Sequence, residues 1–416
     1  MLMPELGRRT FLTAGAMSLS MAAMPLRAQT GSGPLRSLTA GAKPITPAER
    51  LAHVGKAQSL MRAAGIGSLL IEPGASLTYF TGVQWRRSER LTAAVVPANG
   101  DAFVVTPFFE EPSVRESLAI PAKILTWQED EDPLALVADA LRTRGLAAQP
   151  IAVEETVRFF ATHGLGSAGL DVRSGAAIVR GCRMIKSASE IALMQAAADV
   201  TMAAYRDVHP RIRRGMNPAE IGAMMNAATA TLGGTPEFAL VLLGEASAYP
   251  HGSGKPQMVR DNEVVLMDCG CTVHGYQSDI SRSFVFETPT PRQRKVWNQM
   301  RRGQDIAFAA AKLGTPAGRV DDAVRTWYTR QGYGPGYNLP GLSHRTGHGI
   351  GMDGHEPVNL VHGETTPLAP GMCFSNEPGL YLPGEFGIRL EDCFHMTASG
   401  PRYFSQPSPS IDRPFG

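Results

Sequence analysis

Asp268 and Asp279 are two carboxylates on either side of a short turn signal, His274-Gly275. The segments flanking the turn are apolar, which predicts two strands that pair as an antiparallel hairpin. The two aspartates lie almost symmetrically about a centre between Val273 and His274, so we expect them to be cross-strand neighbours on one face. Like charges in that position destabilise a sheet, and the pair therefore indicates a cation bound between them.

A second carboxylate pair repeats this construction. Glu377 and Glu391 are symmetric about Gly384, which stands in the turn signal Leu382-Pro383-Gly384-Glu385. A structural salt bridge is the alternative for either pair alone. Four carboxylates facing one site would repel one another strongly, and they suit two divalent cations about 3.5–4 Å apart.

Three of the ten histidines, His344, His348 and His355, fall within one glycine-rich stretch. Glycines at 347, 349, 351 and 354 argue against a regular helix, so His344 and His348 are not a helical metal-binding pair. The stretch lacks the GxxxxGK[ST] motif of a phosphate-binding loop. A hydrogen-bonded core residue is the alternative for any single histidine, and their clustering favours a site.

The elements that must position these residues follow a repeated order. Ser187 and Glu190 have capping-box spacing, which predicts a helix to about residue 208, and another helix follows Asn217-Pro218. Strands are expected near 238–243 and 264–285. Helices over about 292–313 and 318–331 and strands in the 370s and 380s repeat this order. The pattern indicates two helix-plus-hairpin halves.

The preceding region has a different, mixed α/β pattern. Helices are expected over 47–64 and 133–144, with strands at 68–71, 91–96, 102–105 and 151–154. This region contains no cluster of His, Cys and carboxylates, so we interpret it as structural or as a gate for substrate.

Composition narrows the class of protein. The chain has 416 residues, of which 43% are hydrophobic, and its formal net charge of +2 argues against nucleic acid or an anionic membrane as partner. The mature chain has no apolar run of about 20 residues, so no membrane span is expected. Five cysteines exclude a disulfide-built scaffold, and most are expected to be core thiols.

The N-terminus is expected to be an export signal. Arg8-Arg9 precedes Thr10-Phe11-Leu12 and an uncharged stretch to Leu26, which resembles the bacterial twin-arginine signal. This predicts a periplasmic protein exported already folded. The predicted division is a signal (1–28), a flexible linker (29–46), an N-terminal domain (47–182), a catalytic domain (183–405) and a tail (406–416).

The motifs around the candidate ligands resemble those of the pita-bread metallopeptidases. This family includes Xaa-Pro aminopeptidases, Xaa-Pro dipeptidases, methionine aminopeptidases and creatinase. The matching positions are Asp268 in D-C-G-C, Asp279 in S-D-I-S-R-S-F, His348 in G-H-G-I-G, Glu377 in N-E-P-G-L-Y and Glu391 in G-I-R-L-E-D. The resemblance implies an α/β protein with a pita-bread catalytic domain after a smaller creatinase-type N-terminal domain, and Y-F-T-G at 79–82 matches the latter.

The resemblance also implies roles for these residues. Asp279 and Glu391 would bridge two metal ions, Asp268 would complete one site, and His348 with Glu377 would complete the other. Mn²⁺ is the expected ion, with Co²⁺, Zn²⁺ or Fe²⁺ as alternatives.

Glu377 would also accept a proton from water acidified by the two ions and return one to the leaving amine. His251 and His355 match substrate-side histidines, His344 matches a third pocket histidine, and Arg389 is expected beside the substrate and carboxylates.

The expected activity is therefore hydrolysis of the bond between an N-terminal residue and proline in a dipeptide or longer peptide. The family implies a homodimer. The sequence leaves open whether the enzyme is a dipeptidase or an aminopeptidase. The other classes are a non-catalytic binding protein and a metallohydrolase of another small amide on the same fold.

Overall fold

The apolar runs of the first region form one six-stranded mixed sheet. The computed structural model describes residues 34–416, so the predicted signal at 1–28 lies outside the described residues. Strand order is β4-β3-β2-β1-β5-β6, with β2 antiparallel to both of its neighbours. The strands are β1 (Ser68–Ile71), β2 (Ala93–Pro97), β3 (Phe103–Pro107), β4 (Lys123–Trp127), β5 (Ile151–Val153) and β6 (Val172–Ser174).

Helices cover both faces of this sheet, which explains why its strands are apolar on both sides. Leu69 and Ile71 pack with α1 on one face, whereas Leu70 packs with α4 and α5 on the other. The short helix η1 (Phe108–Glu110) follows β3. The α-helices are α1 (Pro47–Ala64), α2 (Ala75–Thr81), α3 (Glu111–Ser117), α4 (Pro133–Thr143), α5 (Phe159–Ser167) and α6 (Ala176–Arg183).

The second region contains two antiparallel sheets and a separate hairpin. One sheet has the order β10-β8-β7 with β9 pairing β8, the other has the order β12-β11-β13-β16-β17, and β14 pairs β15. The strands are β7 (Thr235–Leu243), β8 (Val264–Val273), β9 (Tyr276–Gln277), β10 (Ile280–Val285), β11 (Gly347–Gly349), β12 (Glu356–Leu360), β13 (Cys373–Asn376), β14 (Gly379–Leu382), β15 (Phe386–Arg389), β16 (Asp392–Thr397) and β17 (Gly400–Tyr403).

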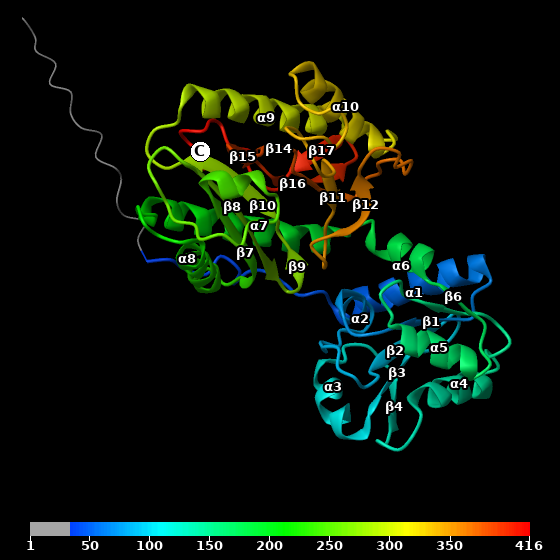
Figure 1. Ribbon diagram of the computed structural model, residues 1–416. Coiled ribbons are helices and arrows are strands. Elements are labelled where there is room, and N and C mark those ends of the chain that lie inside the picture. Colours follow the sequence, from blue (N-terminus) through cyan, green and yellow to red (C-terminus); the bar gives the residue numbers. More distant parts are fainter. Residues whose placement is uncertain (1–33) are drawn as a thin grey trace, which may run out of the picture. The chain divides into compact units, whose positions relative to one another are not determined.

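The predicted repeat of helices and strands is confirmed. Ser187 and Asn217 each cap a helix through a complete capping box, as does Thr290 in the second half. The helices of this region are α7 (Ala188–Val208), η2 (His209–Arg211), α8 (Pro218–Thr231), η3 (Gly244–Ala248), α9 (Pro291–Ala310) and α10 (Gly318–Arg330). In Figure 1, α7 and α8 lie on one side of the strands, and α9 and α10 lie on the other.

Strand β8 separates two cores, and this decides where the first candidate ligand points. Val265 and Met267 join the core under α7 and α8, whereas Val264 and Leu266 join the core of the second half. Asp268 has the same parity as Val264 and Leu266, so it projects from the inner face, between the two halves.

The residues before α1 differ from the flexible linker that was predicted for 29–46. In the described part, the Leu38 amide donates to Leu232 O at 2.9 Å, and the Thr39 hydroxyl donates to Gly233 O at 3.0 Å. Ile45 is buried in the core under α7 and α8. The chain therefore packs along the second region before it enters α1, because its few apolar side chains find buried positions there.

All five cysteines are buried free thiols. Within residues 34–416, no helix is long and apolar enough to cross a membrane.

Candidate metal centre

The first carboxylate pair lies on the predicted hairpin, but in a different register. His274 and Gly275 form the turn with positive φ angles of 49° and 85°, as a two-residue hairpin loop requires. Val273 pairs with Tyr276, and the same offset places Asp268 opposite Ser281. The predicted centre between Val273 and His274 would place Asp268 directly opposite Asp279. The observed pairing does not.

The two aspartates are instead diagonal neighbours. Asp279 is two residues before Ser281, the residue that faces Asp268, so both carboxylates project from the same face of the hairpin. Gly270 is required at this point, because a Cβ there would lie 2.3 Å from Ser278 O. The two aspartates share one face, as expected. The expected pairing is wrong, because the centre of the hairpin lies one residue further along the chain.

The second pair has the predicted register. Gly379 pairs with Arg389 in the β14–β15 hairpin, and Asn376 pairs with Asp392 in the neighbouring β13–β16 ladder. Glu377 and Glu391 occupy the symmetric positions between these two ladders. The two glutamates thus enter the site from two adjacent segments of one long, interrupted hairpin.

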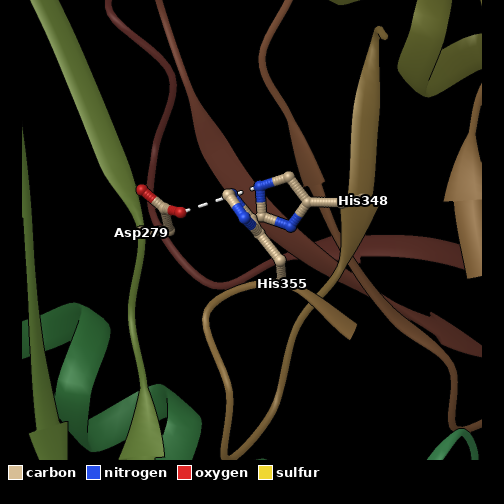
Figure 2. A group of neighbouring side chains, drawn as sticks. All are labelled: Asp279, His348 and His355. Atoms are coloured by element: carbon tan, nitrogen blue, oxygen red, sulfur yellow. Dashed lines mark ion pairs between the residues drawn. The ribbon is translucent and has the colours of Figure 1, made fainter. Parts of the chain in front are cut away.

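His348, in β11, presents a free ring nitrogen to these carboxylates. Its Nδ1 donates to Gly349 O at 3.0 Å, which leaves the lone pair on Nε2. Nε2 lies 3.1 Å from Glu377 Oε1 and 3.8 Å from Asp279 Oδ2. Figure 2 shows the side chains of Asp279 and His348 pointing toward each other, with the His355 ring beside them. A lone pair repels the carboxylate oxygens that it faces, and a cation bound between them would remove this repulsion.

Several carboxylate oxygens lack any partner. Asp268 Oδ1, Asp279 Oδ1 and Glu391 Oε1 are buried and accept no hydrogen bond from the described residues. Burial, followed by repulsion from neighbouring carboxylates, raises the pKa of Asp279 and of Glu391 well above the ordinary range. Unsatisfied anionic oxygens of this kind are costly in a protein interior without a positive ion.

The ligand atoms also have the spacing that a metal ion requires. Ligand atoms of Asp268, Asp279 and Glu391 lie within 4.8 Å of one another, as do those of His348, Glu377 and Glu391. A third such group contains Asp279, His348 and His355. Oxygen-rich sets with one imidazole suit divalent ions such as Mn²⁺, and the residues present therefore fit the expected ions.

Arg389 contacts one of the proposed metal ligands, Asp268. Its guanidinium donates to Asp268 Oδ2 at 2.6 Å, to Tyr381 Oη at 3.2 Å and to Pro250 O at 3.1 Å. One Arg389 charge cannot balance four carboxylates. It orients Asp268 and leaves the remaining negative charge for cations.

The other predicted histidines line the same cavity, which has a volume of about 860 Å³. His344 Nε2 lies 2.7 Å from Tyr381 Oη. The ring centroid of His355 lies 4.0 Å from that of His348. Burial lowers the pKa of His355 to about 4, so the ring is neutral at physiological pH. His251 is exposed at the cavity wall beside Pro250.

Sequence reasoning missed one wall of the cavity. Residues of the first region line it, including the 73–75 turn, Arg87, Glu154 and Thr156. Arg87 donates to Pro73 O at 3.0 Å and to the Thr156 hydroxyl at 2.9 Å. These residues are scattered along loops and follow no ligand spacing. The sequence indicates only that the first region is structural or a gate for substrate.

The two helix-plus-hairpin halves and the carboxylate-rich centre between them define a pita-bread metallopeptidase fold. Residues 192–398 match the model of metallopeptidase family M24, and residues 53–185 match the creatinase/prolidase N-terminal domain.

Individual relatives agree with these matches. The "probable dipeptidase PepE" of Mycobacterium tuberculosis is 33% identical over 349 residues, which cover 81% of this chain and 89% of that protein. The Xaa-Pro dipeptidase of Lactobacillus helveticus is 29% identical, with 85% and 96% covered. The crystal structure of dipeptidase PepE from Mycobacterium ulcerans has a TM-score of 0.80 at 30% identity, with 88% and 97% covered. The chain belongs to metallopeptidase family M24.

Proposed function

We propose that the chain is a dinuclear-metal-dependent exopeptidase that hydrolyses the bond between an N-terminal residue and proline. The observation that carries this proposal is the set of unpartnered carboxylate oxygens on Asp268, Asp279 and Glu391. Their ligand atoms lie within 4.8 Å of one another, and those of Glu391 also lie this close to ligand atoms of His348 and Glu377. The relative from Lactobacillus helveticus is named an Xaa-Pro dipeptidase, which supports proline as the second residue.

The proposed ligands divide between two ions. Asp279 and Glu391 would bind both ions, Asp268 would complete one site, and His348 with Glu377 would complete the other. Bound divalent ions, with Mn²⁺ as our first candidate, would polarise the scissile carbonyl and lower the pKa of water. Burial opposes ionisation of Glu377, but the positive charge around it, that of Arg389 included, outweighs burial and keeps the pKa of Glu377 below the ordinary value.

Glu377 is therefore ionised and placed to accept a proton. It would take the proton from the attacking water and deliver one to the departing proline nitrogen. His355 and His251 would orient the substrate and donate hydrogen bonds to the carbonyl oxygen as negative charge develops there. His344 would line the pocket with its ring held by Tyr381. The walls contributed by the first region would limit access of bulk water.

We propose dipeptides as the main substrates, because the Mycobacterium and Lactobacillus relatives described above are named dipeptidases. An Xaa-Pro aminopeptidase is the second candidate, since a cavity of about 860 Å³ is large enough for longer peptides. A metallohydrolase of another small amide and a non-catalytic binding protein are the alternatives outside proline peptidases.

The test compares Gly-Pro dipeptides with Xaa-Pro-Xaa tripeptides, with Mn²⁺ added and then removed by a chelator. Metal-dependent cleavage of dipeptides alone supports the dipeptidase, and preference for tripeptides supports the aminopeptidase. If the protein binds metal but cleaves neither substrate, the proline proposal is wrong.

Two further proposals concern the protein in the cell. We propose twin-arginine export to the periplasm, which the Arg8-Arg9 motif supports, and sequencing the N-terminus of the mature protein tests it. We also propose a homodimer. Phe108, Phe109 and Phe159 of the first region are 59%, 58% and 80% exposed, and such aromatic side chains are common at interfaces. Light scattering measures the mass in solution.

A further inference from the structure

Arg183 is a buried arginine that connects three segments of the chain. It is the last residue of α6, and its side chain is only 10% exposed. Nη1 donates to the Ser76 hydroxyl, at the start of α2, at 2.9 Å. Nη2 donates to Asp353 Oδ2 at 2.7 Å and to Glu356 Oε1 at 2.5 Å. One guanidinium thus joins the first region to the loop before β12.

Glu356, the first residue of β12, holds that loop through its side chain. Besides Arg183, its carboxylate accepts hydrogen bonds from Lys186 Nζ at 2.9 Å, from the Met352 amide at 2.9 Å and from the Asp353 amide at 3.2 Å. The loop is therefore folded around a buried carboxylate that two cations neutralise. Buried charges hold a conformation well only when they are satisfied in this way.

The loop has little freedom to take another shape around this carboxylate. A Cβ on Gly351 would lie 2.7 Å from Glu356 Oε1 and 2.8 Å from Lys186 Cε. The backbone thus passes directly against the ion pair. Any loss of the Glu356 contacts would release the segment that carries residues 351–355.

His355 depends on this loop for its position. It directly precedes Glu356, and its ring lies against His348 at the metal centre. Among the described residues, no hydrogen bond holds its side chain, which is exposed to the cavity. The position of this ring therefore depends on its packing against His348 and on the backbone, which Glu356 holds.

We propose that Arg183 is a positioning residue of the peptidase reaction, which holds His355 in place through Glu356 and Asp353. The inference rests on the proposed function, in which His355 faces the substrate carbonyl. Ser76 also donates to Glu154, a residue of the first region that lines the cavity. Arg183 is therefore connected to cavity-lining residues of both regions.

The experiment compares Arg183→Gln and Arg183→Lys with a matched control, Arg180→Gln. Arg180 lies one turn earlier on α6 and forms an exposed ion pair with Glu155, a kind of pair that contributes little to stability. The turnover number, KM, bound Mn²⁺ and melting temperature are measured for each protein. Loss of one oxyanion-binding donor reduces turnover by about 10²–10³-fold, so misplacement should reduce it by roughly 10–100-fold.

We expect this loss for Arg183→Gln at unchanged metal content, with a smaller loss for Arg183→Lys and none for Arg180→Gln. A purely structural role predicts a lower melting temperature with kcat and KM of the folded, metal-loaded enzyme within about twofold of wild type, and that result would overturn the proposal. If Arg183→Gln does not fold, Glu356→Gln is examined by the same measurements with the same expectation.

Hydrogen exchange separates failure of this inference from failure of the proposed function. If wild type cleaves no proline peptide, the proposed function fails, and turnover then tests nothing about Arg183. Amide exchange in the segment 350–357 is expected to be faster in Arg183→Gln than in wild type and Arg180→Gln, whatever the substrate. Unchanged exchange in that segment would show that Arg183 does not hold the loop, and the positioning role would be wrong.

Discussion

Asp279 lies diagonally across a β-hairpin from Asp268, on the same face, with Ser281 rather than Asp279 directly opposite Asp268. The diagonal arrangement separates the two charges further than direct pairing would, yet keeps both on the inner face. Ser281 donates to Glu391 Oε2 at 2.8 Å and so links this hairpin to the second carboxylate pair. The position directly opposite Asp268 thus holds a hydroxyl that orients a third proposed ligand.

Metal binding should stabilise the protein strongly. Burial, followed by repulsion from neighbouring carboxylates, raises the pKa of Asp279 and of Glu391, so we expect Mn²⁺ to raise the melting temperature above that of chelated protein. Free metal at 100 times Kd contributes about 2.7 kcal/mol per site. Differential scanning calorimetry with and without chelator measures the change.

The variant Glu391→Gln provides the contrast. It removes one repelling charge and one proposed bridging ligand, so the chelated variant should melt at or above chelated wild type and gain less from Mn²⁺. A full Mn²⁺-dependent gain in this variant would contradict the assignment of Glu391 as a shared ligand.

Glu377→Gln should reduce turnover by roughly 10²–10⁴-fold, the usual contribution of a general acid or base, because the amide cannot accept a proton. Steady-state kinetics and bound metal are measured together, since Gln can still offer an oxygen ligand. Glu385→Gln, on the exposed turn between β14 and β15, is the control and should retain full activity. Wild-type turnover in Glu377→Gln would remove the proposed proton transfer.

Acid should destabilise the protein partly through Glu356. Burial alone would raise its pKa, but the charges of Lys186 and Arg183 outweigh burial and hold it at about 2, below the ordinary 4.5. A carboxylate with a lowered pKa stabilises the fold above the unfolded-state value. That contribution, roughly 3 kcal/mol, should therefore disappear as the pH falls from about 4.5 toward 2.

Urea unfolding at pH 7, 4 and 3 tests this expectation against Glu356→Gln, in which the other titrating groups are retained. At pH 7 the variant should be less stable by about 3–5 kcal/mol, because Arg183 and Lys186 lose their buried partner. The difference between the two proteins should shrink at pH 3. A difference independent of pH would show that the Glu356 charge does not stabilise the fold.

Gly270→Ala should destabilise the first hairpin and weaken metal binding. The new methyl group would lie 2.3 Å from Ser278 O and 2.5 Å from the Phe238 ring, so the strands must move apart where Asp268 and Asp279 stand. Overpacking of this kind costs about 1–3 kcal/mol. Thermal unfolding and Mn²⁺ titration measure both effects. Gly166→Ala, in α5 with open space around it, is the control and should keep stability and metal affinity.

Much of the candidate site could be predicted from the sequence because local patterns decide it. The register of Glu377 and Glu391 follows from symmetry about Gly384, since a single short turn sets the pairing of both strands. The capping residues Ser187 and Asn217 likewise mark their helices through contacts only three residues away. Interactions of such short range depend little on the rest of the fold.

Tertiary structure decided what depends on contacts between distant segments. The register of Asp268 depends on which two residues occupy the tight turn. The observed pairing places Asp268 opposite Ser281, two residues beyond Asp279, and a shift of two residues leaves the alternation of apolar residues unchanged. The cavity wall with Arg87 and Glu154, and the contact of Arg183 with Glu356 across 173 positions, have no sequence pattern. Packing of separate elements places them together, and periodicity within one element contains no information about that packing.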